Sequence, residues 1–227
     1  MPAPSPVPRS AARARILSVA GLLFYEHGIR AVGVDTIIKE ADVAKMTFYK
    51  HFASKDQLVI EYLRTRDRQW WSWIDAALKN YAADDPRKPL VVFDALEQRL
   101  RRPFKRGCAF VNAMTDLADA SHPAYQVALR HKEQVELFLH DLCQELDYEH
   151  PDELTQQLIL LLEGALVRAQ RAGIAGPAKT AKELGRKILA ASPRSVRPAE
   201  SSSRALPSRA RKPEEGAEPG HRGAQPL

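Results

Sequence analysis

The stretch that decides the fold is residues 36–58, which read TIIKEADVAKMTFYKHFASKDQL. Its first part predicts a short helix with one apolar face, because apolar residues recur there at helical spacing. These residues are Val34, Ile37, Ile38 and Ala41. Asp42 tolerates turn conformations, and Val43 then fills the corner before a second short helix.

The second short helix has an aromatic inner side and a polar, cationic outer side. Ala44, Phe48 and Phe52 fall four residues apart and predict one inward stripe. Each helical residue turns by about 100°, so the residues between them point outward. The outward set is Lys45, Met46, Thr47, Tyr49 and Lys50. This pattern favours a helix-turn-helix whose second helix enters a DNA major groove.

A third helix begins directly after this pair. Ser54 and Gln57 have the spacing of an N-cap and its capping-box partner. The free N–H groups of such a helix start attract phosphate, and His51 and Lys55 lie beside it. The alternative is an ordinary all-α core with charges on its solvated side. A generic helix pair has no reason to gather these side chains beside a cap, so we prefer the DNA interpretation.

Residues 10–58 resemble the DNA-binding domain of the TetR family of bacterial transcriptional regulators. Four segments carry the resemblance: Phe24, His27 and Gly28; Val34-Asp35-Thr36-Ile37; Thr47-Phe48-Tyr49-Lys50-His51-Phe52; and Ser54-Lys55-Asp56-Gln57-Leu58. The resemblance implies an N-terminal three-helix domain followed by a helical dimerisation and effector domain. It also implies that double-stranded operator DNA and a small-molecule effector are the partners of a homodimer.

The resemblance assigns DNA contacts to individual side chains. The base-reading surface comprises Lys45, Met46, Thr47 and Lys50, and the phosphate contacts are Tyr49, His51 and Lys55.

The chain departs from the family pattern at three positions. Gly33 stands where Ser or Thr usually caps the second helix, and Asp42 replaces the usual turn glycine. Met46 replaces a common small residue. It either contacts a thymine methyl group or makes base readout different from that of relatives.

Composition excludes several other classes of protein. The 227 residues are 44% hydrophobic and 27% charged, which is typical of a globular chain with one or two domains. No apolar run approaches the ~18 residues of a membrane span. The N-terminus lacks the apolar region of a secretion signal. With only Cys108 and Cys143, which lack metal-type spacing, we expect a reduced, cytoplasmic protein without a membrane partner.

Positive charge is concentrated at the two ends of the chain. Residues 1–64 hold nine Lys/Arg against six Asp/Glu, and residues 193–227 hold seven against four. Residues 65–192 hold eighteen of each. A basic N-terminal module on a neutral body is the pattern expected for duplex DNA binding. Arg9, Arg13 and Arg15 either form an arm on the DNA or are only solvated.

The periodicity along the chain predicts an all-α fold without strands. We divide it into a disordered arm (1–9), the helix-turn-helix domain (10–58), a helical ligand-binding and dimerisation domain (59–192) and a disordered tail (193–227). The tail is rich in Pro, Ser, Arg and Gly and has too few large apolar groups to fold.

A ligand pocket can only be guessed from bulky side chains in the larger domain. The guessed set is Trp70, Phe93, Phe104, Phe110, Met114 and Tyr125. Core packing explains each of them equally well.

The helix expected from Pro151 is apolar almost all round between Leu158 and Leu162, so it needs burial on two sides. We therefore predict a four-helix interface with a second copy. Its members are Leu158, Leu161, Leu162, Ala165, Leu166, Leu184 and Ile188. The alternative is a monomer with an unusually deep core.

Catalytic patterns are missing from the sequence. We find no Gly-rich phosphate loop, no H-E-x-x-H and no nucleophile elbow, so we expect no enzyme, cofactor or metal. Cys108 follows Lys105-Arg106-Gly107 at a helix start, where a thiolate is stabilised. It is either an oxidant or electrophile sensor or a small buried hydrophobe.

The sequence therefore predicts a DNA-binding regulator, a repressor that a small ligand releases from a palindromic operator. A redox-sensing regulator acting through Cys108 is one alternative. A small all-α enzyme and a helical adaptor that binds another protein are the competitors from other classes.

Overall fold

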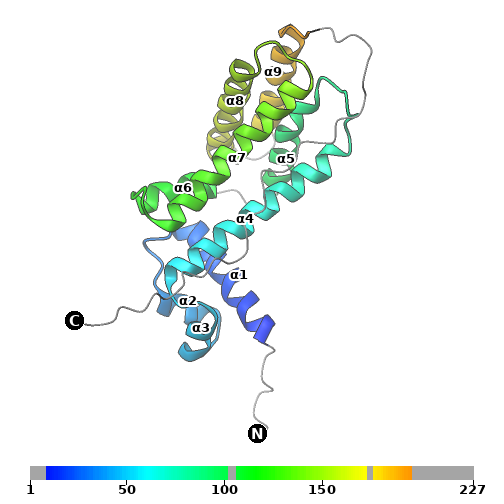
Figure 1. The fold of residues 1–227 in the computed structure, drawn as a ribbon. Helices are drawn as coiled ribbons and strands as arrows, with labels where there is room; N and C mark the ends of the chain where they lie inside the picture. Colours follow the sequence, from blue (N-terminus) through cyan, green and yellow to red (C-terminus); the bar gives the residue numbers. More distant parts are fainter. Residues whose placement is uncertain (1–8, 102–105, 173–175, 196–227) are drawn as a thin grey trace, which may run out of the picture.

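The computed structural model describes residues 9–101, 106–172 and 176–195. In these ranges the chain forms nine α-helices and one short 3-10 helix and contains no strand, so the predicted all-α fold is confirmed. Figure 1 shows an elongated molecule with α1 to α3 at one end and α8 and α9 at the other. The long helix α4 runs between the two ends.

The N-terminal end is built from four helices: α1 (Arg9–His27), α2 (Val34–Glu40), α3 (Lys45–His51) and α4 (Lys55–Leu78). α1 packs against the other three. Gly28 ends α1 with a φ of 91°, and Asp42 makes the turn between α2 and α3 with a φ of 48°. α1 begins at Arg9, so Ser10 lies inside the helix.

The remaining elements form the larger end: η1 (Lys88–Leu90), α5 (Val91–Leu100), α6 (Ala109–Leu117), α7 (Pro123–Glu145), α8 (Pro151–Ala172) and α9 (Gly176–Ala191). Local signals explain the start of α7. Pro123 occupies the first turn of α7, and the His122 side chain accepts a 3.1 Å hydrogen bond from the Ala124 N–H.

Two hydrophobic clusters fill the interior. One joins the N-terminal helices to α6 and α7, and the other lies among α4, α5, α7, α8 and α9. The boundary expected after residue 58 falls inside α4, which continues from one cluster into the other. The shared helix α4 therefore links the N-terminal end directly to the larger end of the molecule.

The beginning of the expected tail is hydrogen-bonded to the turn between α7 and α8. The Ser195 N–H donates to the Asp147 carbonyl at 2.8 Å, and the Arg194 guanidinium donates to the Leu146 carbonyl at 2.7 Å. Residues 1–8 and 196–227, for which we expect disorder, lie outside the described residues.

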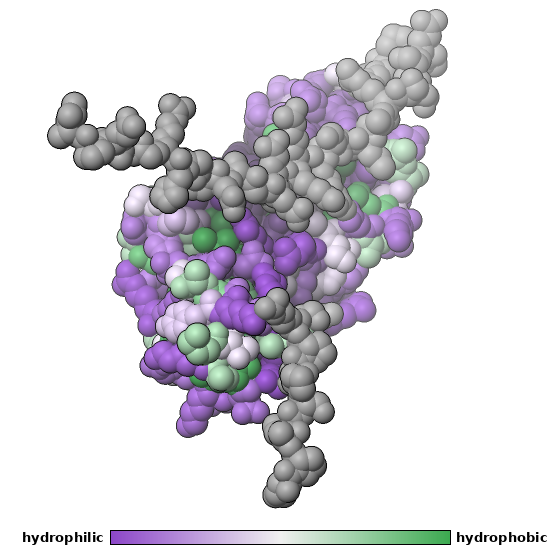
Figure 2. Space-filling model, turned by 60° about the horizontal axis from the view of Figure 1, so that its bottom comes forward, coloured by the Kyte–Doolittle hydropathy of each residue, from purple (hydrophilic) through white to green (hydrophobic). Residues whose placement is uncertain are grey.

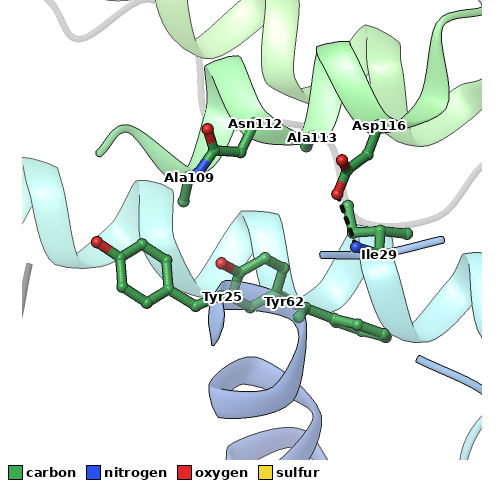
Figure 3. Close-up of a pocket in the computed structure, with 8 residues that line it drawn as sticks. Tyr25, Ile29, Tyr62, Ala109, Asn112, Ala113 and Asp116 are labelled. Atoms are coloured by element: carbon green, nitrogen blue, oxygen red, sulfur yellow. Dashed lines mark hydrogen bonds between the residues drawn. The ribbon is translucent and has the colours of Figure 1, made fainter. Parts of the chain in front are cut away.

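Direct hydrogen bonds join the end of α1 to α6, and Figure 3 shows the one between Ile29 and Asp116. The Ile29 N–H donates to Asp116 Oδ2 at 2.7 Å, and the Arg30 guanidinium donates to the Leu117 carbonyl at 2.9 Å. The Tyr25 hydroxyl donates to the Gly107 carbonyl at 3.2 Å. The cavity beside these bonds is only about 10 Å³, enough for about one water molecule.

Gly28→Ala tests this junction. At a φ of 91° a Cβ is strained, and here it would lie 2.9 Å from Asp116 Oδ2. We expect the free energy of unfolding to fall by about 1–3 kcal/mol, measured by urea denaturation followed by circular dichroism. Gly176→Ala, where the added Cβ meets open space, is the control and should change it by less than about 0.5 kcal/mol. Equal effects of the two changes would contradict the assigned strain.

Candidate nucleic-acid interface

Two phenylalanines attach α3 to the rest of the domain. Phe48 and Phe52 are both 0% exposed, and their ring centroids lie 6.1 Å apart. Burial of one such side chain contributes about 1.5–3 kcal/mol. The expected third member of this stripe is wrong, because Ala44 is exposed. Ala44 is the N-cap of α3 with extended backbone, so its side chain does not follow the helical spacing.

The turn between α2 and α3 is braced from α1. The Arg15 guanidinium donates to the Asp42 carbonyl at 2.7 Å, which satisfies a carbonyl in the left-handed turn. Arg13 pairs with Glu61 at 2.8 Å and lies over the Phe52 ring at 5.1 Å. Both arginines therefore have partners inside the domain, which does not favour the arm contact considered for them.

The start of α4 has the predicted cap. Ser54 Oγ accepts from the Gln57 N–H at 3.1 Å, and Gln57 Oε1 accepts from the Ala53 N–H at 2.7 Å. Partial burial lowers the pKa of Lys55, and the neighbouring Asp56 carboxylate partly offsets this. By contrast, Gly33 caps α2 without any side-chain hydrogen bond.

The residues assigned to DNA lie together on α3 and the first turn of α4. Lys45, Met46, Tyr49 and Lys50 are exposed, whereas Thr47, His51 and Lys55 are half-buried. These seven residues are all of the predicted DNA contacts, and their roles in DNA binding remain predictions. Figure 2 views the molecule with this end turned forward and shows hydrophilic surface around small apolar areas.

Charge on this surface is partly neutralised by the protein itself. The Lys45 ammonium lies 3.4 Å from the Asp35 carboxylate of α2. The Tyr49 ring makes an edge contact with Phe48, with centroids 5.3 Å apart. That contact holds one edge of the Tyr49 ring at the buried inner face, while the side chain stays exposed on the outer face.

The residues guessed for a ligand pocket fall into different parts of the structure, and their ligand role stays a prediction. Trp70 and Phe93 are buried in one hydrophobic cluster, whereas Phe110 and Met114 belong to the other. Phe104 lies outside the described residues, and Tyr125 is half-buried on α7. Trp70, Phe93 and Phe110 pack in the protein core, and bulk and hydrophobicity alone could not distinguish such packing from a pocket lining.

Two of them, Trp70 and Phe110, surround the buried His131. The His131 ring stacks on Phe110 with centroids 3.5 Å apart, and Trp70 approaches it edge-on at 6.3 Å. His131 Nδ1 lies 2.7 Å from Asp67 Oδ1, which also accepts from the Trp71 indole N–H. Burial lowers the pKa of His131, and Asp67 opposes this shift. The arrangement is a polar link between α4, α6 and α7.

The two cysteines differ in environment. Cys143 is buried, and burial raises the pKa of its thiol to about 12, which makes it a poor nucleophile. Cys108 is half-buried at the N-cap of α6 and packs against the cluster that contains Phe110. Its burial agrees with the packing interpretation, and the sensor role stays a prediction.

Polar side chains also gather on the surface of the larger part of the chain. A wide hollow of about 550 Å³ between α7 and α8 is lined by Glu133, Glu136, Leu137, His140, Asp152, Glu153, Thr155 and Gln156. Among the described residues, no group of three or more His, Cys, Asp or Glu side chains is placed to hold a metal ion. In the same ranges, no helix has the length and apolar character needed to cross a membrane.

The fold and the exposed α3 surface define a helix-turn-helix protein with a larger all-helical domain. Residues 16–62 match the family model described as "Bacterial regulatory proteins, tetR family". The chain is 30% identical over 186 residues to the HTH-type transcriptional repressor KstR2 of Mycobacterium tuberculosis, covering 78% of this chain and 89% of the relative. It is 32% identical to the transcriptional regulator AcuR of Cereibacter sphaeroides, covering 64% and 70%.

Solved structures give the same result. SCO4454, a TetR-family transcriptional regulator from Streptomyces coelicolor, matches with a TM-score of 0.72 and 31% identity, covering 80% of this chain and 95% of that chain. The chain belongs to the TetR family, and it is a transcriptional regulator rather than an enzyme.

Phe48→Ala tests the anchoring of α3. We expect the free energy of unfolding to fall by about 3–5 kcal/mol, because the change removes a fully buried ring. Met46→Ala, on the same helix but 81% exposed, is the matched control and should cost less than about 0.5 kcal/mol. Thermal and urea unfolding measure both. Similar losses for the two variants would contradict the assigned inner and outer faces.

Proposed function

We propose that the protein is a repressor that binds a palindromic operator as a homodimer and is released by a small-molecule effector. The observation that carries this proposal is the outer face of α3, which stays exposed while Phe48 and Phe52 hold its inner face. The printed name of KstR2 supports repression, with 89% of that relative covered. An activator, FasR of Mycolicibacterium smegmatis, is 31% identical but only 43% covered.

Within this proposal the side chains divide by chemistry. Met46, Thr47 and Lys50, with Lys45 at the edge, face the base pairs; Tyr49, His51 and Lys55 contact the phosphates. A tyrosine hydroxyl and a lysine ammonium both donate to phosphate oxygens, and the start of α4 adds its helix dipole. Two copies of α3 then occupy successive major grooves about 34–36 Å apart.

The dimer surface predicted from the sequence includes residues that face the protein's own core. Leu158, Leu162 and Ala165 are buried within their own chain, so they are not available to a partner and this part of the prediction is wrong. The all-round apolar pattern of α8 could not show which side faces α9. Leu161, Leu166 and Ile188 are partly buried against the same core, and Leu184 alone of the predicted set is exposed.

The apolar surface left on α8 supports a different face. Leu160 is 69% exposed and Val167 is 60% exposed, and they flank Gly164, where an added Cβ would meet open space. Positions 160, 164 and 167 fall on one helical stripe. Leu184 adds an exposed apolar side chain on the adjacent helix α9. We assign the α8 face to the second copy, because large apolar side chains grouped on one surface mark interfaces.

Release by an effector requires a link between the two ends. α4 belongs to both hydrophobic clusters, and Asp116 of α6 holds the Ile29 N–H at the end of α1. An effector that binds better to a conformer with displaced α4 or α6 would change the spacing of the two recognition helices. It would weaken DNA binding only by its differential affinity for the two conformers.

DNA binding is tested on the region upstream of the protein's own gene. We expect a palindromic footprint and an affinity that falls steeply between 50 and 200 mM salt, because phosphate contacts release counterions. Tyr49→Ala and Lys55→Ala should each weaken binding by about tenfold or more, since each removes a contact from both half-sites. Fluorescence anisotropy measures both effects.

Lys79→Ala, an exposed lysine at the other end of α4, is the matched control and should bind like the wild type. Unchanged binding by both the Tyr49 and Lys55 variants would remove their phosphate roles. A wild-type protein indifferent to every duplex offered would overturn the proposed function.

Dimerisation is tested by placing charge on the α8 face. The double variant Leu160→Glu with Val167→Glu should sediment as a 25.4 kDa monomer, whereas the wild type sediments at twice that mass. Unpaired carboxylates cannot be buried at an interface without a large cost. Leu22→Glu, at a leucine of α1 that is 59% exposed, is the control and should stay dimeric. A dimer in all three proteins would contradict the assigned face.

A further inference from the structure

Met46 is the most exposed large apolar side chain among the described residues, at 81%. Single exposed apolar side chains are common on protein surfaces, so exposure alone carries little weight. Its position carries more. Met46 is the second residue of α3, and two residues of helix turn it by about 200° from the buried Phe48. It therefore projects from the most outward side of the helix.

The side chains next to Met46 on the outer side of α3 do not cover it. Lys45 is turned toward Asp35 of α2, with 3.4 Å between ammonium and carboxylate. Thr47 is half-buried, so it projects less. Lys50 lies one turn further along the same side of the helix and is exposed. Met46 and Lys50 thus form an exposed ridge on the outer side of α3.

We propose that Met46 selects thymine in the operator by packing on its C5-methyl group. In the major groove only thymine presents a methyl group, and it is the apolar feature of an otherwise polar edge. Methionine is long, unbranched and polarisable, so it can adapt to such a group. This inference rests on the proposed DNA binding. Lys50, one helical turn from Met46, would then lie near the base pairs beside that thymine.

The test uses a duplex recovered by the wild-type protein from a random-sequence pool. Each thymine of the half-site is replaced by deoxyuridine, which removes the methyl group and keeps base pairing. Wild-type affinity should fall about fourfold per half-site at one position, which corresponds to about 0.8 kcal/mol for one buried methyl group. At that position Met46→Ala should bind the thymine and uracil duplexes equally.

Met46→Leu keeps an apolar side chain and should retain part of the discrimination. If no position distinguishes the wild type from Met46→Ala, while both still bind DNA in a salt-sensitive way, the thymine inference is overturned and the proposed function stands. If the wild type recovers no sequence from the pool, the proposed function and this inference are overturned together. The double-mutant cycle separates the methyl contact from any general weakening.

Discussion

The burial of Phe48 and Phe52 is the interaction on which the DNA-binding end depends. α3 has only seven residues, too few to be stable alone, so its position comes from packing. The two rings fix the inner side of the helix, and Arg15 fixes the turn that precedes it. The outer side is then presented to solvent, with Met46 and Lys50 exposed. An exposed face on a rigid base is what direct base readout requires.

The same cluster extends past the DNA-binding helices and makes them continuous with the larger domain. Phe110 of α6 and Ala128 of α7 pack in it together with Phe48 and Tyr62. A displacement of α6 therefore cannot leave the base of the recognition helix unchanged, since packed interiors transmit strain. His131 of α7 stacks on Phe110 of this cluster and makes a part-buried bond to Asp67 of α4. This continuity gives a physical basis for coupling an effector site to DNA affinity.

Local signals were predictable from the sequence, whereas long-range partners were not. The aromatic spacing of Phe48 and Phe52 and the cap at Ser54 depend on residues within one or two helical turns. The burial of Leu158 depends on α9, because a Cβ at Gly185 would lie 3.3 Å from Leu158, and no pattern within α8 shows this. The bond from Arg15 to Asp42 and the pair of His131 with Asp67 likewise join residues far apart in the chain. The predicted dimer residues depend on such long-range partners, which is why that prediction was wrong in part.

A crystal structure of the protein on its operator tests the central claim most directly. The account predicts that Lys50 and its neighbours on the outer side of α3 lie within contact distance of base edges in the major groove. Phe48 and Phe52 would remain buried as they are in the free protein. A complex in which another surface meets the DNA, with the outer side of α3 turned toward solvent, would contradict the account.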